Sequence, residues 1–345
     1  MTLLSRNENG LLEIINPKDL RILFLAPYAP DAPDYGKCEY DGDGGYADYY
    51  YNILQTLKCL GFVVDSSSKP YTIAHSSGIS DYVFSLYNRM PMHNSEVFIS
   101  AYCEYLCIPY LGAAPNVRCL AEDKYLSKLA AAMLGIPTPN GKAYTRNHHA
   151  ILPPEFAGPY FIKDRFGAGS EGIDENCLQD TWEGAKGIIY AYWEEGKDVL
   201  VEQFVDGIDI TASILGDEAP LFLGLIHPKS DKKHSILTED LKLYDHLGYE
   251  TFDAGNHRAV FESDARAIWE SFGPIDYFRM DYRYDPRTGA RWFIEFNVCC
   301  YLGRGGAIAL SGYEQGFEYE KILNHIVGYS LQRQVGLRDN AQRIL

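Results

Sequence analysis

The feature that most constrains the fold is a predicted β-hairpin, YFRMDYRYDPRTGARWFIEFN, in which two alternating runs flank a turn-forming cluster. On one face, the first run carries Arg279 and Asp281, and the second carries Glu295 and Asn297. If the hairpin is symmetric about its turn, Asp281 lies opposite Glu295 and Arg279 lies opposite Asn297. Because two facing carboxylates destabilise a sheet, this pairing favours a bound cation between them.

The same face offers a ligand set made only of oxygen. Two carboxylates and an amide, from Asp281, Glu295 and Asn297, suit Mg²⁺, which also keeps waters and takes phosphate oxygens. We therefore predict these three residues as metal ligands. The alternative is a solvated polar face on an edge hairpin, and a register slip of one residue would break the proposed set.

A glycine-rich segment follows another predicted strand in the stretch PYFIKDRFGAGSEGI. Lys163 ends the strand, and Gly167, Gly169, Ser170 and Gly172 follow. Glycines let backbone amides approach a phosphate closely, so we predict a loop that covers phosphates. The literal GxGxxG also raises a dehydrogenase, but a dinucleotide fold places that motif after its first strand and at the start of a helix. A plain hairpin turn is the structural alternative.

A third stretch, VLVEQFVDGIDITASIL, places Glu202 at the end of an apolar strand and Asp209 seven residues later. A strand edge can bind a purine through its backbone, and a carboxylate can bind a ribose. A surface carboxylate after a turn is the alternative for either residue.

The pattern of strands and helices divides the chain into three parts. In residues 1–118, the runs RILFLAP, FVVDS, DYVFSLYN and IPYLG are predicted strands that alternate with helices, which favours a parallel α/β lobe. Beyond this lobe, DKYLSKLAAAMLG is an amphipathic helix, and strands joined by turns dominate. We predict two α+β lobes there, 119–204 with the glycine-rich loop and 205–345 with the metal site.

Composition restricts the partners. With 345 residues and a net charge of −16, the chain lacks the basic field that nucleic acids and anionic membranes require. We expect a cytoplasmic protein, because no long apolar run or secretory leader is present. The eight cysteines form no CxxC pair, so reduced thiols are expected. For Cys299 and Cys300, core packing is favoured over substrate contact.

The order of these elements resembles the ATP-grasp family, and within it the D-alanine–D-alanine ligases. A helix lysine, a strand lysine with a glycine loop, a strand glutamate, Arg-x-Asp and Glu-x-Asn occur in the family's order over roughly residues 105 to 330. The resemblance implies an N-terminal parallel α/β lobe and two α+β lobes that sandwich ATP. It also implies Mg²⁺, with two ions, for which Mn²⁺ can substitute.

The resemblance assigns roles by position in this sequence. Nucleotide binding falls to Lys124, Lys163, Gly167, Gly169, Ser170, Gly172, Glu202, Gln203, Phe204, Val205 and Asp209. The catalytic group is Arg279, which meets the acyl group, with Lys242 on a mobile loop and Ser170 in the glycine loop. Asp281, Glu295 and Asn297 are the magnesium ligands.

The sequence departs from the ligase pattern where the amino acids bind. After Asn297 the chain continues as VCCYLGRGG, Leu243 replaces a tyrosine of the closing loop, and GGYADYYYN stands where the first substrate is contacted. D-alanyl-D-alanine is therefore not the expected product. Gly303, Arg304, Gly305 and Tyr46 are predicted substrate contacts.

The expected reaction joins a small-molecule carboxylate to an amine, both amino-acid-like, through an acyl phosphate, with release of ADP and phosphate. The resemblance suggests a homodimer. The alternative from another class is a nucleotide-binding protein without ligation, which acts as a sensor or in assembly. An acyl kinase and a carboxylate–thiol ligase also remain open.

Overall fold

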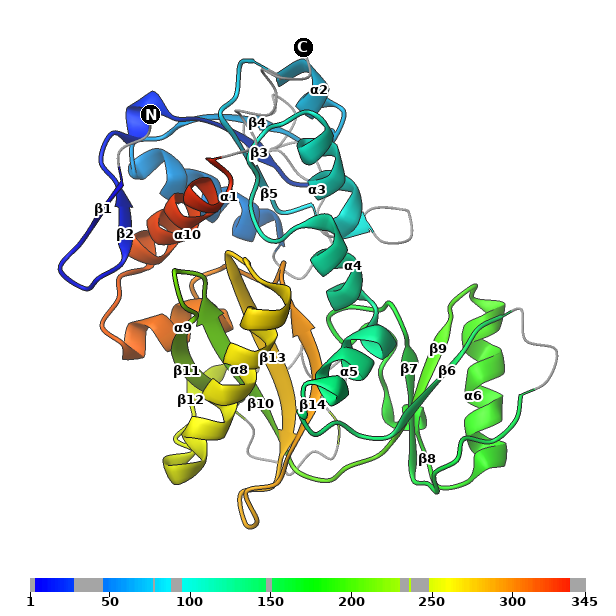
Figure 1. The fold of residues 1–345 in the computed structure, drawn as a ribbon. Coiled ribbons are helices and arrows are strands. Elements are labelled where there is room, and N and C mark those ends of the chain that lie inside the picture. The colour runs from blue at the N-terminus through cyan, green and yellow to red at the C-terminus, as the bar shows by residue number, and fades with distance from the viewer. Residues whose placement is uncertain are drawn as a thin grey trace.

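The computed structural model describes residues 4–27, 46–76, 78–87, 95–146, 151–229, 236 and 248–335. Figure 1 shows three lobes, each with a sheet: one at the top, formed by the N-terminal part of the chain, and two side by side below it. Within these ranges, no helix has the length and apolar character needed to cross a bilayer. The parallel and antiparallel sheets and their helices confirm the predicted α/β and α+β architecture.

The first lobe is built on a parallel sheet with the strand order β4-β3-β5. Residues Ile22 to Leu25 in the middle strand are all buried, which is typical of a strand with both faces covered. The elements of this lobe are β3 (Arg21–Leu25), α1 (Tyr46–Cys59), β4 (Val63–Ser67), α2 (Thr72–Ser76), β5 (Tyr82–Ser85), α3 (Ser95–Tyr105) and the 3₁₀ turn η1 (Pro17–Asp19). The predicted parallel sheet is confirmed.

The strand predicted at IPYLG does not form. Only an isolated bridge joins Tyr110 to Val83, beside β5. The run still bonds to β5, because Val83 N donates to Pro109 O at 2.8 Å and Leu111 N donates to Val83 O at 3.0 Å. Tyr110 N faces away from β5 and donates to the side-chain Oε1 of Gln334, at 3.1 Å. The pairing stops at this one bridge, so the run is a connection and not a strand.

The second lobe is a four-stranded antiparallel sheet with the order β6-β9-β7-β8, packed against one helix. Its elements are β6 (Gly141–Tyr144), β7 (Tyr160–Asp164), η3 (Glu175–Cys177), β8 (Leu178–Gln179), α6 (Trp182–Glu194) and β9 (Val199–Gln203). The helices α4 (Pro115–Glu122) and α5 (Lys124–Met133) connect it to the first lobe (Figure 1). Asp123 begins α5 by accepting hydrogen bonds from two of its first backbone amides.

The third lobe contains a five-stranded antiparallel sheet with the order β12-β11-β10-β13-β14. Its elements are β10 (Ile208–Leu215), β11 (Leu221–Pro228), β12 (Tyr249–Thr251), η4 (Gly255–His257), α8 (Arg258–Phe272), β13 (Tyr277–Tyr284), β14 (Arg291–Asn297) and α9 (Ala307–Glu314). The hairpin register is confirmed: Asp281 pairs with Glu295, and Arg279 pairs with Asn297. A bulge after Asp281 shifts the rest, so Tyr282 pairs with Phe293.

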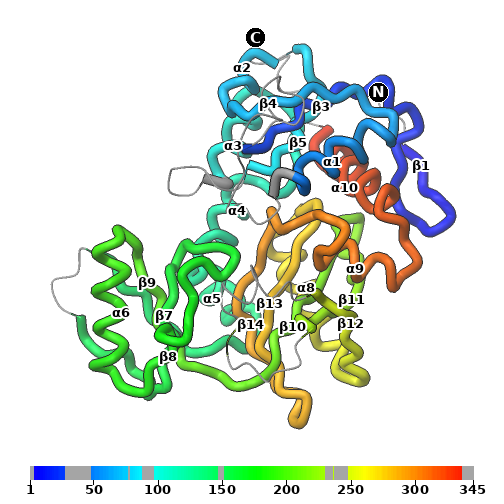
Figure 2. Tube along the Cα trace, turned by 180° about the vertical axis from the view of Figure 1, so that it is seen from behind, coloured from blue at the N-terminus to red at the C-terminus, as the bar shows by residue number. Residues whose placement is uncertain are grey.

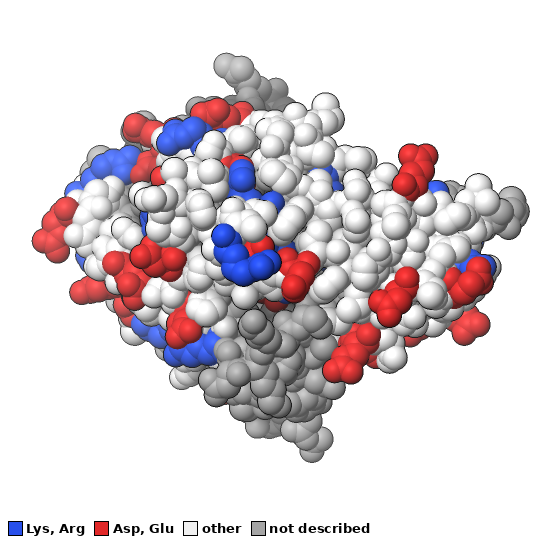
Figure 3. Space-filling model, turned by 90° about the horizontal axis from the view of Figure 1, so that it is seen from below, with Lys and Arg blue, Asp and Glu red and all other residues white. Residues whose placement is uncertain are grey.

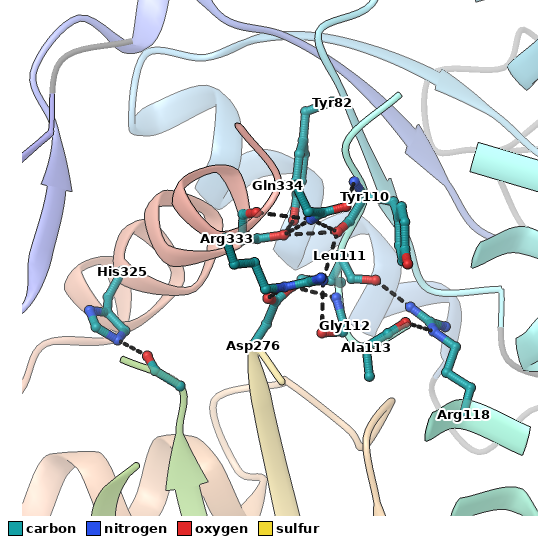
Figure 4. Close-up of polar contacts among 12 residues, drawn as sticks. Tyr82, Tyr110, Leu111, Gly112, Ala113, Arg118, Asp276, His325, Arg333 and Gln334 are labelled. Atoms are coloured by element: carbon teal, nitrogen blue, oxygen red, sulfur yellow. Dashed lines mark hydrogen bonds and ion pairs between the residues drawn. The ribbon is translucent and has the colours of Figure 1, made fainter. Parts of the chain in front are cut away.

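The C-terminal helix α10 (Tyr319–Arg333) returns to the first lobe and packs beside the small hairpin of β1 (Leu4–Arg6) and β2 (Leu12–Ile14) (Figure 1). Its Ile326 and Val327 share one apolar core with Ile22 and Phe24. A buried polar network adds to this contact (Figure 4). Arg333 bonds Asp276, which precedes β13, and Gln334 bonds Tyr110. The first and third lobes are thus joined through a common interior.

Candidate functional site

A cleft of about 1180 Å³, its open mouth included, is lined by residues from both the four-stranded and the five-stranded sheet. Figure 2 shows these two sheets from behind, with α5 between them. The lining includes these residues predicted from the sequence: Lys124, Lys163, Gly167, Gly169, Ser170, Glu202, Gln203, Phe204, Val205, Asp209, Arg279, Asp281 and Glu295. Elements far apart in the sequence therefore meet in one place.

The two lysines predicted to meet phosphates are held by one local arrangement. Asp123 caps α5 and also accepts two hydrogen bonds from the Arg165 guanidinium, at 2.8 and 2.6 Å. Lys124 N donates to Arg165 O at 3.1 Å. The start of α5 is therefore fixed to the end of β7, where Lys163 lies.

The Lys124 ammonium reaches across the cleft. Its Nζ lies 3.2 Å from Glu295 Oε2 and donates to Gly167 O in the glycine-rich loop. One positive charge thus contacts both the predicted metal face and the predicted phosphate loop.

The glycine-rich segment forms a loop, as predicted. An added Cβ at Gly167 would lie 2.9 Å from Asp164 Cβ, so a side chain there would force the loop away from β7. Ser170 has a φ of 65°, a left-handed conformation that is uncommon for residues other than glycine. Gly172 O accepts a hydrogen bond from Tyr192 of α6, at 3.0 Å, which anchors the far end of the loop.

Glu202 is buried between two lysines at the inner wall. Lys163 Nζ lies 2.8 Å from Oε2, and Lys128 Nζ lies 2.6 Å from Oε1. Burial acts to raise the pKa of Glu202, but the two ammonium charges outweigh it and lower the pKa below its usual value. Sequence reasoning missed Lys128, although its place one helical turn after Lys124 could have indicated it.

The segment that follows Glu202, for which the sequence predicts a base-binding edge, lines the cleft. Asp209 receives an ion pair from Arg283, with Nη1 3.1 Å from Oδ2. Arg283 also lies over the Phe204 ring and donates to Val205 O, at 3.4 Å. Arg283 is a second residue whose role sequence reasoning missed, although it follows Arg279 and Asp281 at the spacing of one strand face.

The three side chains predicted as metal ligands lie together. The Asn297 amide donates to Asp281 Oδ2, at 3.2 Å, and to Glu295 Oε1, at 3.4 Å. Thr211 donates to the other Asp281 oxygen, at 2.7 Å. Burial acts to raise the pKa of Glu295, but the nearby positive charges, Lys124 foremost, lower it to about 2.

This donor set fits Mg²⁺ once the amide turns its oxygen inward. The set contains only two carboxylates, and among the described residues no cluster of three His, Cys, Asp or Glu side chains could hold a metal. With the amide as a third ligand, several coordination positions would be left for water and phosphate oxygens, which Mg²⁺ prefers.

Arg279 lies beside this face. Its Nε is buried 3.4 Å from Asp281 Oδ2. Burial acts to lower the pKa of Arg279, but the Asp281 charge and other neighbours raise it overall, so the guanidinium stays positive. Tyr249 of β12 also lines the cleft. Burial raises the pKa of its phenol, and the charge of Arg279 opposes this shift. The sequence analysis did not single out Tyr249.

The remaining predicted residues lie elsewhere or outside the description. Lys242 lies outside the described residues, and so does the side chain of Tyr46, the first residue of α1. Arg304 pairs with Glu320, at 2.6 Å, and lies over the Tyr319 ring. Gly303, Arg304 and Gly305 are not among the residues that line the cleft, and neither are Gly172 and Asn297. Their predicted roles stay predictions.

The loop after Asn297 is tied to the first lobe. Leu302 N donates a hydrogen bond to the Tyr49 hydroxyl, at 3.1 Å. The Tyr49 and Tyr301 rings stack, with centroids 4.2 Å apart. Arg118 donates to Cys299 Sγ at 2.8 Å, and Cys300 is buried in the core. Tyr49 of α1 thus contacts the loop that follows Asn297.

Charges of both signs lie side by side near the middle of the face seen from below (Figure 3). The described part of this face shows no continuous basic surface. This arrangement agrees with the net charge of −16.

No family model matches the chain. It is 25% identical over 310 residues to the uncharacterized protein y4sG of Sinorhizobium fredii, which covers 82% of this chain and 84% of that protein. It is 25% identical over 252 residues to a D-alanine–D-alanine ligase of Carboxydothermus hydrogenoformans, which covers 68% of this chain and 77% of the ligase.

The fold is that of a solved ligase. The structure matches the crystal structure of the D-alanine–D-alanine ligase from Bacillus anthracis complexed with ATP with a TM-score of 0.72. The match covers 92% of this chain and 99% of that chain at 16% sequence identity, a level at which it shows the fold alone.

Proposed function

From the chain's place in the ATP-grasp family, among the D-alanine–D-alanine ligase-like proteins, we propose that it joins a carboxylate to an amine at the expense of ATP. ADP and phosphate are the other products. Both substrates are small amino-acid-like molecules. The observation that carries the proposal is the single cleft in which Lys124, Lys163, Arg279 and the Asp281–Glu295 pair converge.

The first chemical step brings together two negative reactants. An oxygen of the acid attacks the γ-phosphorus of ATP, and the bond between that phosphorus and the bridging oxygen breaks. The products of this step are ADP and an acyl phosphate. Lys124 and Lys163 neutralise phosphate charge on one side of the cleft. Asp281, Glu295 and Asn297 would hold Mg²⁺, which supplies charge neutralisation at the phosphate oxygens.

The second step forms the amide bond. The amine nitrogen attacks the acyl carbon, a proton is lost from nitrogen, and inorganic phosphate leaves. Arg279 stabilises the negative charge that develops on the acyl oxygen, because its guanidinium is held beside Asp281 at the metal face. The glycine-rich loop, with Ser170, excludes water from the hydrolysable acyl phosphate.

A product other than D-alanyl-D-alanine is part of the proposal. Its support is the loop VCCYLGRGG, which stands where D-alanine–D-alanine ligases have a different conserved pattern and which packs on Tyr49. We place the second substrate near this loop, with Gly303 to Gly305 and Arg304 as its candidate contacts.

The test is phosphate release from Mg·ATP against a panel of amino acids and other small acids and amines, with mass analysis of products. ADP, phosphate and a condensed product are expected with one pair. Formation of AMP would contradict the acyl-phosphate route. Slow ATP turnover that no acid or amine accelerates would favour a nucleotide-binding protein without ligation.

A further inference from the structure

Lys128 forms a buried ion pair behind the wall of the cleft. The lysine is 2% exposed and Glu202 is 3% exposed, while Lys163 pairs with the opposite carboxylate oxygen. Glu202 and Lys163 both line the cleft, but Lys128 is not among the lining residues. Lys128 therefore reaches the cleft through its ion pair with Glu202 and not by lining it.

The lysine stem packs against the sheet opposite Glu202. Gly141 of β6 pairs directly with Glu202 of β9. A Cβ added at Gly141 would lie 3.5 Å from Lys128 Cε and 3.4 Å from Leu200 Cδ1, which is ordinary van der Waals contact. The Lys128 stem therefore passes close to the β6 backbone at the residue that pairs with Glu202.

We propose that Lys128 is a positioning residue for nucleotide binding: it holds the Glu202 carboxylate in place from behind, so that Lys163 can turn to the phosphates. The inference rests on the proposed function, since it assumes that the cleft binds Mg·ATP. Its physical basis is the cost of a buried carboxylate that lacks a partner. If Lys163 moves toward a triphosphate, Glu202 keeps one ion pair only because Lys128 remains.

The charge on Lys128 is sensitive to pH near the physiological range. Burial lowers the pKa of Lys128 to about 8, with Lys163 acting in the same direction and Glu202 and Glu295 opposing it. As pH rises through this value, Lys128 loses its proton and Glu202 loses that ion pair. Nucleotide binding should then weaken.

The experiment is calorimetric titration of the full chain with Mg·ATP, which needs no knowledge of the acid or amine. At pH 7.5, we expect Lys128→Met to weaken binding about tenfold, because a buried charge loses its partner. Lys128→Arg should retain most of the affinity. Lys186→Met, a control on α6 where the lysine pairs with Glu183, should bind as the wild type does.

The pH profile separates positioning from a merely structural role. Between pH 7.5 and 9.5 the wild type should lose affinity, while Lys128→Arg keeps it because a guanidinium stays protonated. Wild-type affinity in Lys128→Met at pH 7.5 would overturn the inference. Should that variant fail to fold, identical profiles of the wild type and Lys128→Arg would overturn it. A wild type that does not bind Mg·ATP at all would instead refute the proposed function.

Discussion

Asp281 and Glu295 lie directly opposite each other in the β13–β14 ladder, and the Asn297 amide donates to both carboxylates. Facing carboxylates are unfavourable in a sheet. Two residues from outside the hairpin contact this pair: Lys124 of α5 lies 3.2 Å from Glu295, and Thr211 of β10 bonds Asp281. The lobes therefore bring a cation and a hydroxyl to a pair that the hairpin alone would leave unstable.

Replacing Glu295 by glutamine should abolish ligation while the fold remains. Removing one metal-ligand charge is expected to reduce turnover by about 100-fold or more, because even residues behind metal ligands cost 10- to 100-fold. Turnover is measured by ADP release at saturating Mg·ATP, and folding by circular dichroism. Glu218→Gln is the control, since that side chain is 81% exposed. Near-normal turnover in Glu295→Gln would rule out the metal assignment.

Replacing Arg283 by methionine should raise the KM for ATP about tenfold, which corresponds to the loss of roughly 1.4 kcal/mol of binding energy. The reason is that Asp209 and Val205 O would lose the guanidinium that holds them at the base-binding edge. The measurement is the KM for ATP with kcat recorded beside it. Arg287→Met is the matched control on the same hairpin, because that side chain is 86% exposed. An unchanged KM would show that Asp209 needs no such support.

Replacing Arg333 by methionine should lower the free energy of unfolding by about 3–5 kcal/mol, because Asp276 would be left buried without its charge partner. Asp276 is fully buried, and its Oδ1 lies 2.5 Å from Arg333 Nε. Urea unfolding followed by tryptophan fluorescence measures the change. Arg304→Met removes a pair that is about half exposed and should cost no more than about 1 kcal/mol. Equal losses in the two variants would contradict the account of the buried network.

Stability should fall on acidification in part through His325. Its Nδ1 accepts a hydrogen bond from Leu12 N, at 2.9 Å, and its Nε2 donates to Gly216 O, at 2.8 Å, so the buried ring is neutral. Burial lowers the pKa of His325 in the folded chain. The unfolded chain therefore binds the proton more readily, and this contribution is complete above about pH 6.5 and is lost as pH falls from there.

The measurement is the free energy of unfolding between pH 7.5 and 5.0 for the wild type and His325→Gln. The wild type should lose up to about 1.4 kcal/mol per pH unit more than the variant, the slope for one proton. Parallel profiles would mean that His325 does not titrate on unfolding in this range.

Local patterns were sufficient to predict the pairing of the hairpin. The alternation of Arg279, Asp281, Glu295 and Asn297 predicted a hairpin face, and the structure has the predicted pairs. The bulge that shifts Tyr282 to Phe293 was not predicted, because it depends on packing beyond the hairpin. The strand expected at IPYLG is reduced to one bridge between Tyr110 and Val83, and the outward Tyr110 amide bonds Gln334, more than 200 residues away.

The sequence by itself determined which side chains share a strand face and which loops are rich in glycine, because these follow from the period-two geometry of a strand and from local steric limits. Tertiary structure decided that Lys128 meets Glu202, that Arg283 holds Asp209 and that α10 joins the first lobe. Those outcomes depend on which charges are buried together, and burial is a property of the packed lobes rather than of any one segment.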